Sequence, residues 1–156
     1  MSPTKIYHLT VMCNYLKIIM TNKRVSAIII ESGKILLMHR IKADKDYFVL
    51  PGGSVEESED NISALIREIK EETGLEIEVD KLLWQVNNEF DKRTQYIYLV
   101  LKYFGNLKLG SPEKDRQSED NKYILEWHDI KDLESLNFFP SEIKMNLLKT
   151  FLDDIT

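Results

Sequence analysis

Cysteine is nearly absent from this chain of 156 residues, which contains only Cys13. A single cysteine excludes an internal disulfide and a zinc site built from several cysteines, and it favours a reducing compartment such as the cytoplasm. The sequence also has no uninterrupted run of about 18 apolar residues, which excludes a membrane-spanning helix. Internal repeats and low-complexity segments are missing as well, so neither a solenoid nor a fibrous protein is expected.

What remains is the composition of a globular protein. Hydrophobic residues make up 43% of the chain and charged residues 30%. A chain of this length forms one domain with a core of its own. The net charge of −5 argues against a protein that grips a nucleic-acid polymer by its phosphates. It leaves open a small anionic substrate that arrives with a metal ion.

The acidic residues are concentrated in one segment. Residues 56–80 contain ten acidic and two basic side chains. Acids at this density either form a solvated face or collect cations.

The first 20 residues are treated as an N-terminal extension, and residues 21–156 as the single domain. The extension is apolar, but His8, Asn14 and Lys17 interrupt it and no small-residue cleavage site follows, which argues against a signal peptide. It is either an additional strand or packing arm, or a stretch that precedes a natural start at Met20.

Alternating and β-branched patterns predict strands, and helical periodicity predicts two helices. The expected strands are Val25–Glu31, Lys34–Arg40, Tyr47–Leu50, Ile77–Val86, Thr94–Phe104 and Tyr123–His128. The expected helices span 59–73 and 141–152, with a helical turn at 130–136 and a polar loop at 110–121. Strands before, between and after helices predict an α/β fold with a mixed sheet.

The helix at 59–73 has two distinct sides. Its spacing predicts a buried face made of Ile62, Leu65, Ile66 and Ile69, with Ser58 as the N-cap. Gly74 is the expected C-terminal stop.

Three carboxylates, those of Glu68, Glu71 and Glu72, fall along one flank of this helix. Like charges at this spacing cost a few tenths of a kcal/mol, and a divalent cation with oxygen ligands, such as Mg²⁺, removes the conflict. A solvated charged helix is the alternative interpretation.

The residues around this helix favour the cation-binding interpretation over the solvated helix. From Gly53 the chain reads GSVEESEDNISALIREIKEETGL, which resembles the Nudix box. Every fixed position of that motif is filled at the correct spacing. The matching residues are Gly53, Glu59, Arg67, Glu68, Ile69, Glu71, Glu72, Gly74 and Leu75. Family members often have glycine where this chain has Ser58, a position outside the fixed pattern.

The resemblance implies an α/β/α sandwich with a mixed β-sheet, and hydrolysis of a nucleoside diphosphate linked to a further group X. It also implies Mg²⁺ or Mn²⁺ as the cofactor, held by Glu68, Glu71, Glu72 and the carbonyl of Gly52. Glu68 would also help to activate water. Arg67 would orient Glu68, and Glu59 would steady the loop–helix junction, with Gly53 and Gly74 supporting the box.

Residues outside the box are candidates with ordinary structural alternatives. The family often adds a carboxylate from the loop before the tryptophan-containing strand, which acts as a metal ligand or as a general base. Glu119 or Asp120 would have this role here. The alternative is that both belong to an ordinary solvated loop. Arg40 is a candidate phosphate contact or an exposed strand end. Phe139 and Glu142 resemble residues that contact the base in oxidised-purine triphosphatases, although Phe139 could equally belong to the core.

The favoured substrates are nucleoside triphosphates, including oxidised or non-standard ones, cleaved to a monophosphate and pyrophosphate. ADP-ribose hydrolases of the family commonly carry a proline after the box, and none lies between Pro51 and Pro112. An ADP-ribose or nucleotide-sugar pyrophosphatase and a nucleotide-sensing module without catalysis are the alternatives. Homodimers are common in the family; no nucleic-acid polymer and no membrane is expected as a partner.

Overall fold

The computed structural model describes residues 8–13, 22–89 and 91–152. Most of the predicted N-terminal extension therefore lies outside the described residues, and its described part, 8–13, is helical and exposed. No helix within the described ranges is long and apolar enough to cross a membrane.

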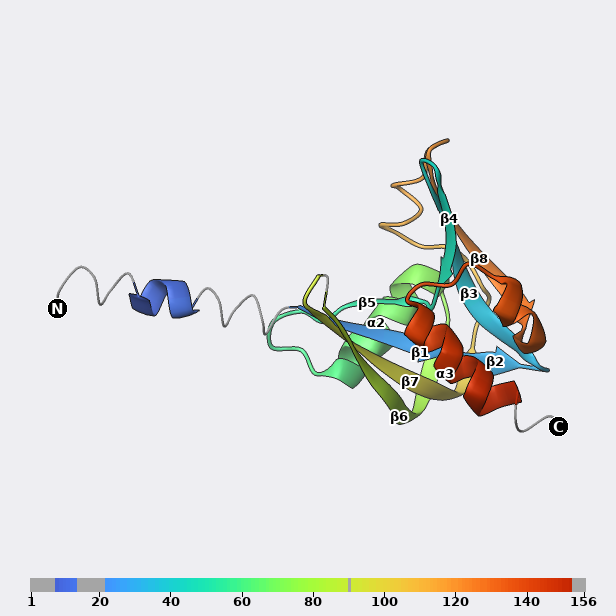
Figure 1. Cartoon of the computed structure of the whole chain (residues 1–156), viewed down its shortest axis with the longest axis horizontal. Coiled ribbons are helices and arrows are strands. Elements are labelled where there is room, and N and C mark those ends of the chain that lie inside the picture. The colour runs from blue at the N-terminus through green and yellow to red at the C-terminus, as the bar shows by residue number, and fades with distance from the viewer. Residues whose placement is uncertain (1–7, 14–21, 90, 153–156) are drawn as a thin grey trace.

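The strands form two four-stranded sheets within a single domain (Figure 1). In the first sheet, β1 lies between β5 and β7, and β6 forms the outer edge. The bounds of these strands are Lys23–Ile28 for β1, Gly52–Ser54 for β5, Glu76–Asn88 for β6 and Arg93–Phe104 for β7. Because β1 runs parallel to β7 and antiparallel to β5, this sheet is mixed, as the sequence predicted.

The second sheet is antiparallel and centred on β3, which pairs with β2, β4 and β8. Its strands span Ile30–Glu31 (β2), Lys34–Lys42 (β3), Lys45–Val49 (β4) and Asn121–Asp129 (β8). Five of the six predicted strands are confirmed, with bounds that differ by a few residues at their ends. The predicted strand Val25–Glu31 is divided into β1 and β2, which belong to different sheets, and β5 was not predicted.

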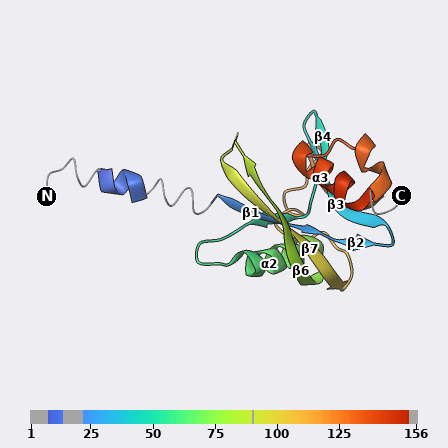
Figure 2. The ribbon, with the colours of Figure 1, turned by 60° about the horizontal axis from the view of Figure 1, so that its bottom comes forward.

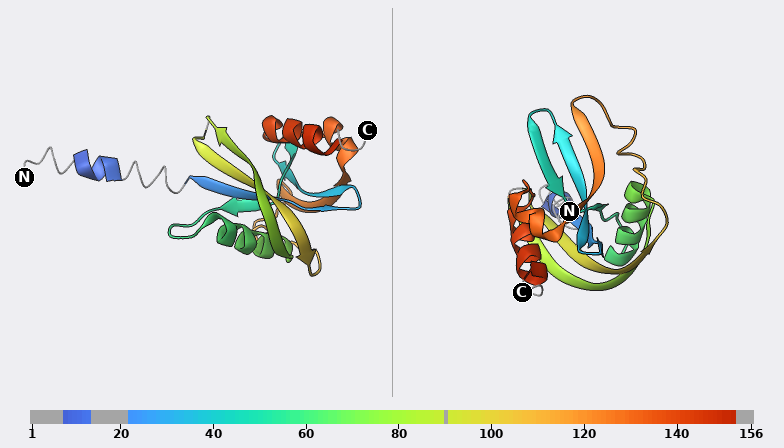
Figure 3. Two further views of the ribbon diagram at one scale, coloured as in Figure 1. Left: turned by 90° about the horizontal axis from the view of Figure 1, so that it is seen from below. Right: turned by 90° about the vertical axis from the view of Figure 1, so that its right-hand side faces the viewer.

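Helices cover both sides of the strands. Helix α2 (Asn61–Thr73) lies on one side, and the 3-10 helix η1 (Ile130–Ser135) with helix α3 (Ser141–Leu152) lies on the other (Figures 2 and 3). The structure has two hydrophobic cores, one on each side of the strands, and β1 contributes to both. Val25 and Ala27 pack in the core beneath α2, while Ile28 packs in the core beneath α3. Burial on both faces explains the continuous apolar run of this strand. The arrangement confirms the α/β/α expectation.

The ends of α2 correct one prediction. The N-cap is Asp60, whose carboxylate accepts from the backbone N–H of Ser63 at 2.8 Å, and not Ser58. Ser58 instead adopts a left-handed backbone with φ of 67°. Glycine takes this conformation without steric cost, which accounts for its frequent use at this position in the family that the box resembles. Gly74 ends the helix in a left-handed conformation, as predicted.

The buried face of α2 is also rotated from the predicted one. Ile62 and Ile66 are 46% and 42% exposed, whereas Ala64, Leu65, Ile69 and Glu72 are buried. The helix therefore turns its carboxylate flank towards the protein. Periodicity alone gave the wrong face because it assigns every apolar residue to the core and every carboxylate to the surface.

A charged cluster ties the three long strands of the second sheet together. The two ring nitrogens of His39 lie 3.0 Å from a Glu126 oxygen and 2.6 Å from an Asp46 oxygen, and His128 contacts the other Glu126 oxygen at 2.7 Å. Carboxylates only accept hydrogen bonds, so His39 satisfies both when both its nitrogens carry protons. Burial acts to lower the pKa of His39, but the bonds to Glu126 and Asp46 outweigh it and raise that pKa above 6.5.

We expect His39 to stabilise the fold in a pH-dependent way. A pKa raised by folding contributes stability that is complete below the unfolded value of 6.5 and disappears as the pH rises through the folded value. The difference in unfolding free energy between the wild type and His39→Gln, measured with urea, should therefore be larger at pH 6 than at pH 9. Lys45→Gln, which removes an exposed charge from β4, should show no such trend. An equal difference at both pH values for His39→Gln would contradict this account.

Candidate active site

The carboxylate flank of α2 opens into a cavity of about 570 Å³ between the two sheets. The acidic residues of the lining include Glu56, Glu68, Glu71, Glu72 and Glu113. Aromatic and apolar residues also line it, including Met38, Tyr47, Val49 and Phe139. A lining that combines charged and apolar side chains is typical of a site for a small ligand with a charged and an uncharged part.

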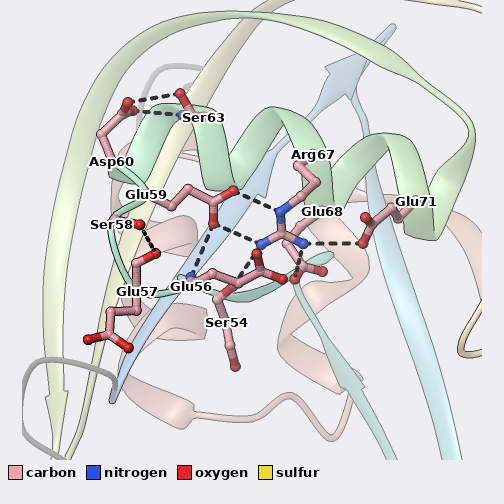
Figure 4. Close-up of polar contacts among 10 residues, drawn as sticks. All are labelled: Ser54, Glu56, Glu57, Ser58, Glu59, Asp60, Ser63, Arg67, Glu68 and Glu71. Carbon is pink, nitrogen blue, oxygen red and sulfur yellow. Dashed lines mark hydrogen bonds and ion pairs between the residues drawn. The ribbon is translucent and has the colours of Figure 1, made fainter. Parts of the chain in front are cut away.

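Arg67 organises the carboxylates of the site (Figure 4). Its guanidinium group donates to both oxygens of Glu59, at 2.8 and 2.9 Å. The same group donates to Glu68 at 2.9 Å, to Glu71 at 3.2 Å and to the carbonyl oxygen of Ser54 at 3.1 Å. These bonds raise the pKa of Arg67, with those to Glu59 contributing most, so the guanidinium stays charged. The paired fork to Glu59 fixes both the position and the plane of the group.

Glu59 links this arginine to the loop before α2. Its carboxylate also accepts from the backbone N–H of Glu56 at 3.1 Å, and the bonds from Arg67 lower its pKa. Glu59 is thus placed at the loop–helix junction, where the resemblance located it.

Gly53 gives Glu68 its place in the cavity. A Cβ atom on Gly53 would lie 2.1 Å from the carboxyl carbon of Glu68. Only glycine therefore leaves room for this carboxylate against β5. Burial raises the pKa of Glu68, although Arg67 opposes that effect.

Glu72 is the most buried of the cavity carboxylates, with 5% of its surface exposed. It accepts from the backbone N–H of Gly52 at 3.3 Å and faces Arg24. Burial raises the pKa of Glu72 to about 8; Arg24 acts to lower it, while Glu113 adds to the rise. A carboxylate buried this deeply is costly unless it is paired or binds a cation.

The loop before β8 supplies Glu113 to the site, a residue that sequence reasoning missed. Glu113 lines the cavity and acts electrostatically on Glu68, Glu72 and Arg24. The two predicted carboxylates, Glu119 and Asp120, are exposed, and neither belongs to the cavity lining.

Gly110 lets the loop pack directly against the C-terminal end of α2, three residues before Glu113. Its N–H donates to the carbonyl of Glu72 at 3.1 Å, and a Cβ atom there would lie 1.8 Å from the carbonyl oxygen of Glu71. The loop therefore follows the end of the helix before it turns into the cavity. A glycine followed at once by Ser-Pro-Glu was the available signal in the sequence.

Of the remaining predicted residues, two line the cavity and one does not. Arg40 lines the cavity, but its guanidinium lies 3.3 Å from the ring centroid of Tyr123 and donates to Asn121 and the carbonyl of Lys122. Phe139 lines the cavity and is 55% exposed, so it is available to a ligand. Glu142 is exposed on α3 and is not part of the lining.

The donor set of the site suits Mg²⁺ or Mn²⁺. Carboxylate and carbonyl oxygens are the ligands these ions prefer. Glu68, Glu71, Glu72 and the carbonyl of Gly52 line the cavity together, although that carbonyl accepts from Arg24 at 3.3 Å. Within the described ranges, no three acidic, histidine or cysteine side chains already converge on one point. An ion that bound here would therefore draw the carboxylates closer together.

Comparison with known proteins agrees with this geometry. The family model described as the NUDIX domain matches residues 20–147. An ADP-ribose pyrophosphatase of Methanocaldococcus jannaschii is 40% identical over 101 residues, which cover 62% of this chain and 60% of that protein. An uncharacterised Nudix hydrolase of Bacillus subtilis, YvcI, is 30% identical over 112 residues, or 70% of this chain and 66% of the relative. The matched region thus spans less than two thirds of either relative.

Solved structures show the same fold. The E. coli ORF135 protein superimposes with a TM-score of 0.64 at 28% identity, covering 84% of this chain and 88% of that protein. A MutT NUDIX hydrolase from Burkholderia pseudomallei gives a TM-score of 0.66 at 26% identity, covering 81% of this chain and 97% of the other. With the box, the cavity and the family match in agreement, the chain belongs to the Nudix hydrolase family, whose members act as pyrophosphohydrolases.

Proposed function

We propose that this protein is a divalent-metal-dependent hydrolase that cleaves the pyrophosphate bond of a nucleoside diphosphate linked to a further group, with nucleoside triphosphates as the favoured substrates. The observation that carries the proposal is the row of cavity carboxylates on α2, held in place by Arg67. A row that only stabilised the fold would not bury Glu72.

In this proposal Glu68, Glu71 and Glu72 hold Mg²⁺, together with the carbonyl of Gly52. The ion would neutralise phosphate oxygens and lower the pKa of an attacking water. Arg67 keeps Glu68 and Glu71 on one side of the cavity before substrate arrives, so little reorganisation is required on binding. Glu113 supplies the further carboxylate of the site, in the role first assigned to Glu119 or Asp120.

The apolar part of the lining suits the nucleoside. Phe139 is 55% exposed and lines the cavity together with Tyr47 and Val49 of β4. The backbone N–H of Phe139 donates to the carbonyl of Phe48 at 2.8 Å, which joins this segment to β4. A flat base could stack on the ring of Phe139 in the cavity that the carboxylates also line.

ADP-ribose is the second candidate substrate, because the relative from M. jannaschii that is 40% identical is named an ADP-ribose pyrophosphatase. A panel of nucleoside triphosphates, oxidised purine triphosphates, ADP-ribose and nucleotide sugars, incubated with Mg²⁺ and analysed by chromatography, distinguishes the two. Selective turnover of triphosphates supports the first candidate. Selective turnover of ADP-ribose supports the second, and binding without any turnover would favour a nucleotide sensor.

Glu72→Gln should lower kcat by at least about a hundredfold on the best substrate, because a neutral amide is a poor ligand for a hard cation. The variant should remain folded by circular dichroism. Glu78→Gln, which neutralises an exposed acid on β6, serves as the control and should retain full activity. Near-normal turnover by Glu72→Gln would refute the assignment of the metal site.

Glu113→Gln and Glu119→Gln form a matched pair within one loop. We expect the first to lower kcat at least about tenfold, since it removes a carboxylate of the cavity, and the second to leave it unchanged. Steady-state kinetics at saturating Mg²⁺ measures both. The reverse order of effects would restore the carboxylate predicted from sequence and exclude Glu113.

A further inference from the structure

Arginines line the cavity as well as carboxylates. The five are Arg24, Arg40, Arg67, Arg93 and Arg116. Arg67 is occupied by the carboxylates of the box, and Arg40 is held over Tyr123 and against β8. Arg24 of β1 and Arg93 of β7 line the same space from two neighbouring strands.

Arg24 lines the cavity from β1. It is paired in register with Ser54 of β5 on one side and Gln95 of β7 on the other. Its guanidinium donates to the carbonyl of Gly52 at 3.3 Å, and the carboxylates of Glu72 and Glu68 act on it electrostatically. An arginine has five N–H donors, so Arg24 can also donate to a phosphate that lies beside these carboxylates.

Arg93 lies further along the same wall, at the start of β7. Its side chain approaches Asp91 at 3.7 Å, which is longer than a hydrogen bond, and both side chains are 41% exposed. An ion pair of this kind contributes little. Arg24 pairs with Gln95 of β7, and Arg93 lies two residues before Gln95 on the same strand. Because side chains alternate along a strand, Arg24 and Arg93 lie on the same face of the sheet.

Two guanidinium groups on one face of neighbouring strands, both in the cavity lining, are typical of an anion site. We infer that Arg24 and Arg93 form a phosphate subsite, next to the carboxylates of α2, that takes a phosphate of the substrate which the metal does not hold. This inference rests on the proposed function, because it assumes that a nucleotide occupies the cavity.

The subsite selects among the candidate substrates by their charge. A nucleoside diphosphate linked to a sugar has only the two bridged phosphates, and those are accounted for at the carboxylate end. A nucleoside triphosphate brings a third phosphate, with more negative charge, and this group gives Arg24 and Arg93 a partner. The pair therefore favours triphosphates over ADP-ribose and nucleotide sugars.

Arg93→Gln and Lys92→Gln test the inference as a matched pair. The two residues are adjacent and each substitution removes one positive charge, but Lys92 is exposed and is not part of the cavity lining. We expect Arg93→Gln to lower kcat/KM for the best triphosphate at least about tenfold, the loss of one or two charge-assisted hydrogen bonds, and to change kcat/KM for ADP-ribose less than about threefold. Lys92→Gln should change neither. Equal losses on both substrates, or no loss on the triphosphate, would overturn the inference.

A binding measurement separates failure of this inference from failure of the proposed function. In EDTA, calorimetry should show that the wild type binds dGTP more tightly than dGDP, and Arg93→Gln should abolish that preference while Lys92→Gln keeps it. This arm needs no turnover, so it holds even for a protein that hydrolyses nothing. A preference that survives in Arg93→Gln would exclude the subsite, whatever the activity of the enzyme.

Discussion

The site depends on one guanidinium group placed among acids that would otherwise repel one another. Arg67 donates to Glu59, Glu68 and Glu71 and to the carbonyl of Ser54, and so joins the loop before α2 to two carboxylates of the helix. Lysine could not make this set of contacts, because its ammonium group is compact and lacks the planar fork. The loop, the helix and the direction of the carboxylates are therefore fixed together.

The same crowding that Arg67 relieves makes the cavity suited to cations. Burial raises the pKa of both Glu68 and Glu72, so each carboxylate is costly to ionise without a positive partner. Arg24 offsets part of this cost for Glu72. The cavity is thus lined by carboxylates and by arginines together. In the function proposed above, a divalent ion would neutralise the carboxylates, and the phosphates of the nucleotide would pair with the arginines.

Much of this architecture could be predicted from the sequence, because the signals involved are local. The strands, the extent of α3 and the end of α2 at Gly74 follow from periodicity and from the conformational freedom of glycine. The box placed Arg67 and the carboxylates of α2 correctly because their spacing on one helix fixes their relative positions.

The errors concern contacts between distant segments. The exposure of Ile62 and the burial of Glu72 depend on what packs against α2, and Glu113 reaches the cavity only because the loop passes Gly110. Arg24 and Arg93 were overlooked for the same reason, since they meet only when β1 pairs with β7. Spacing along the chain gives no information about such pairings.

The central claim is that the cavity carboxylates of α2 form a divalent-cation site. Thermal unfolding of the wild type and Glu72→Gln, each with EDTA and with increasing Mg²⁺, tests it most directly because it requires no knowledge of the substrate. A cation that binds only the folded state raises Tm as its concentration rises. The account predicts that Mg²⁺ raises the Tm of the wild type, and that Glu72→Gln is at least as stable in EDTA but responds much less to Mg²⁺. An equal response of both proteins, or no response in the wild type, would contradict it.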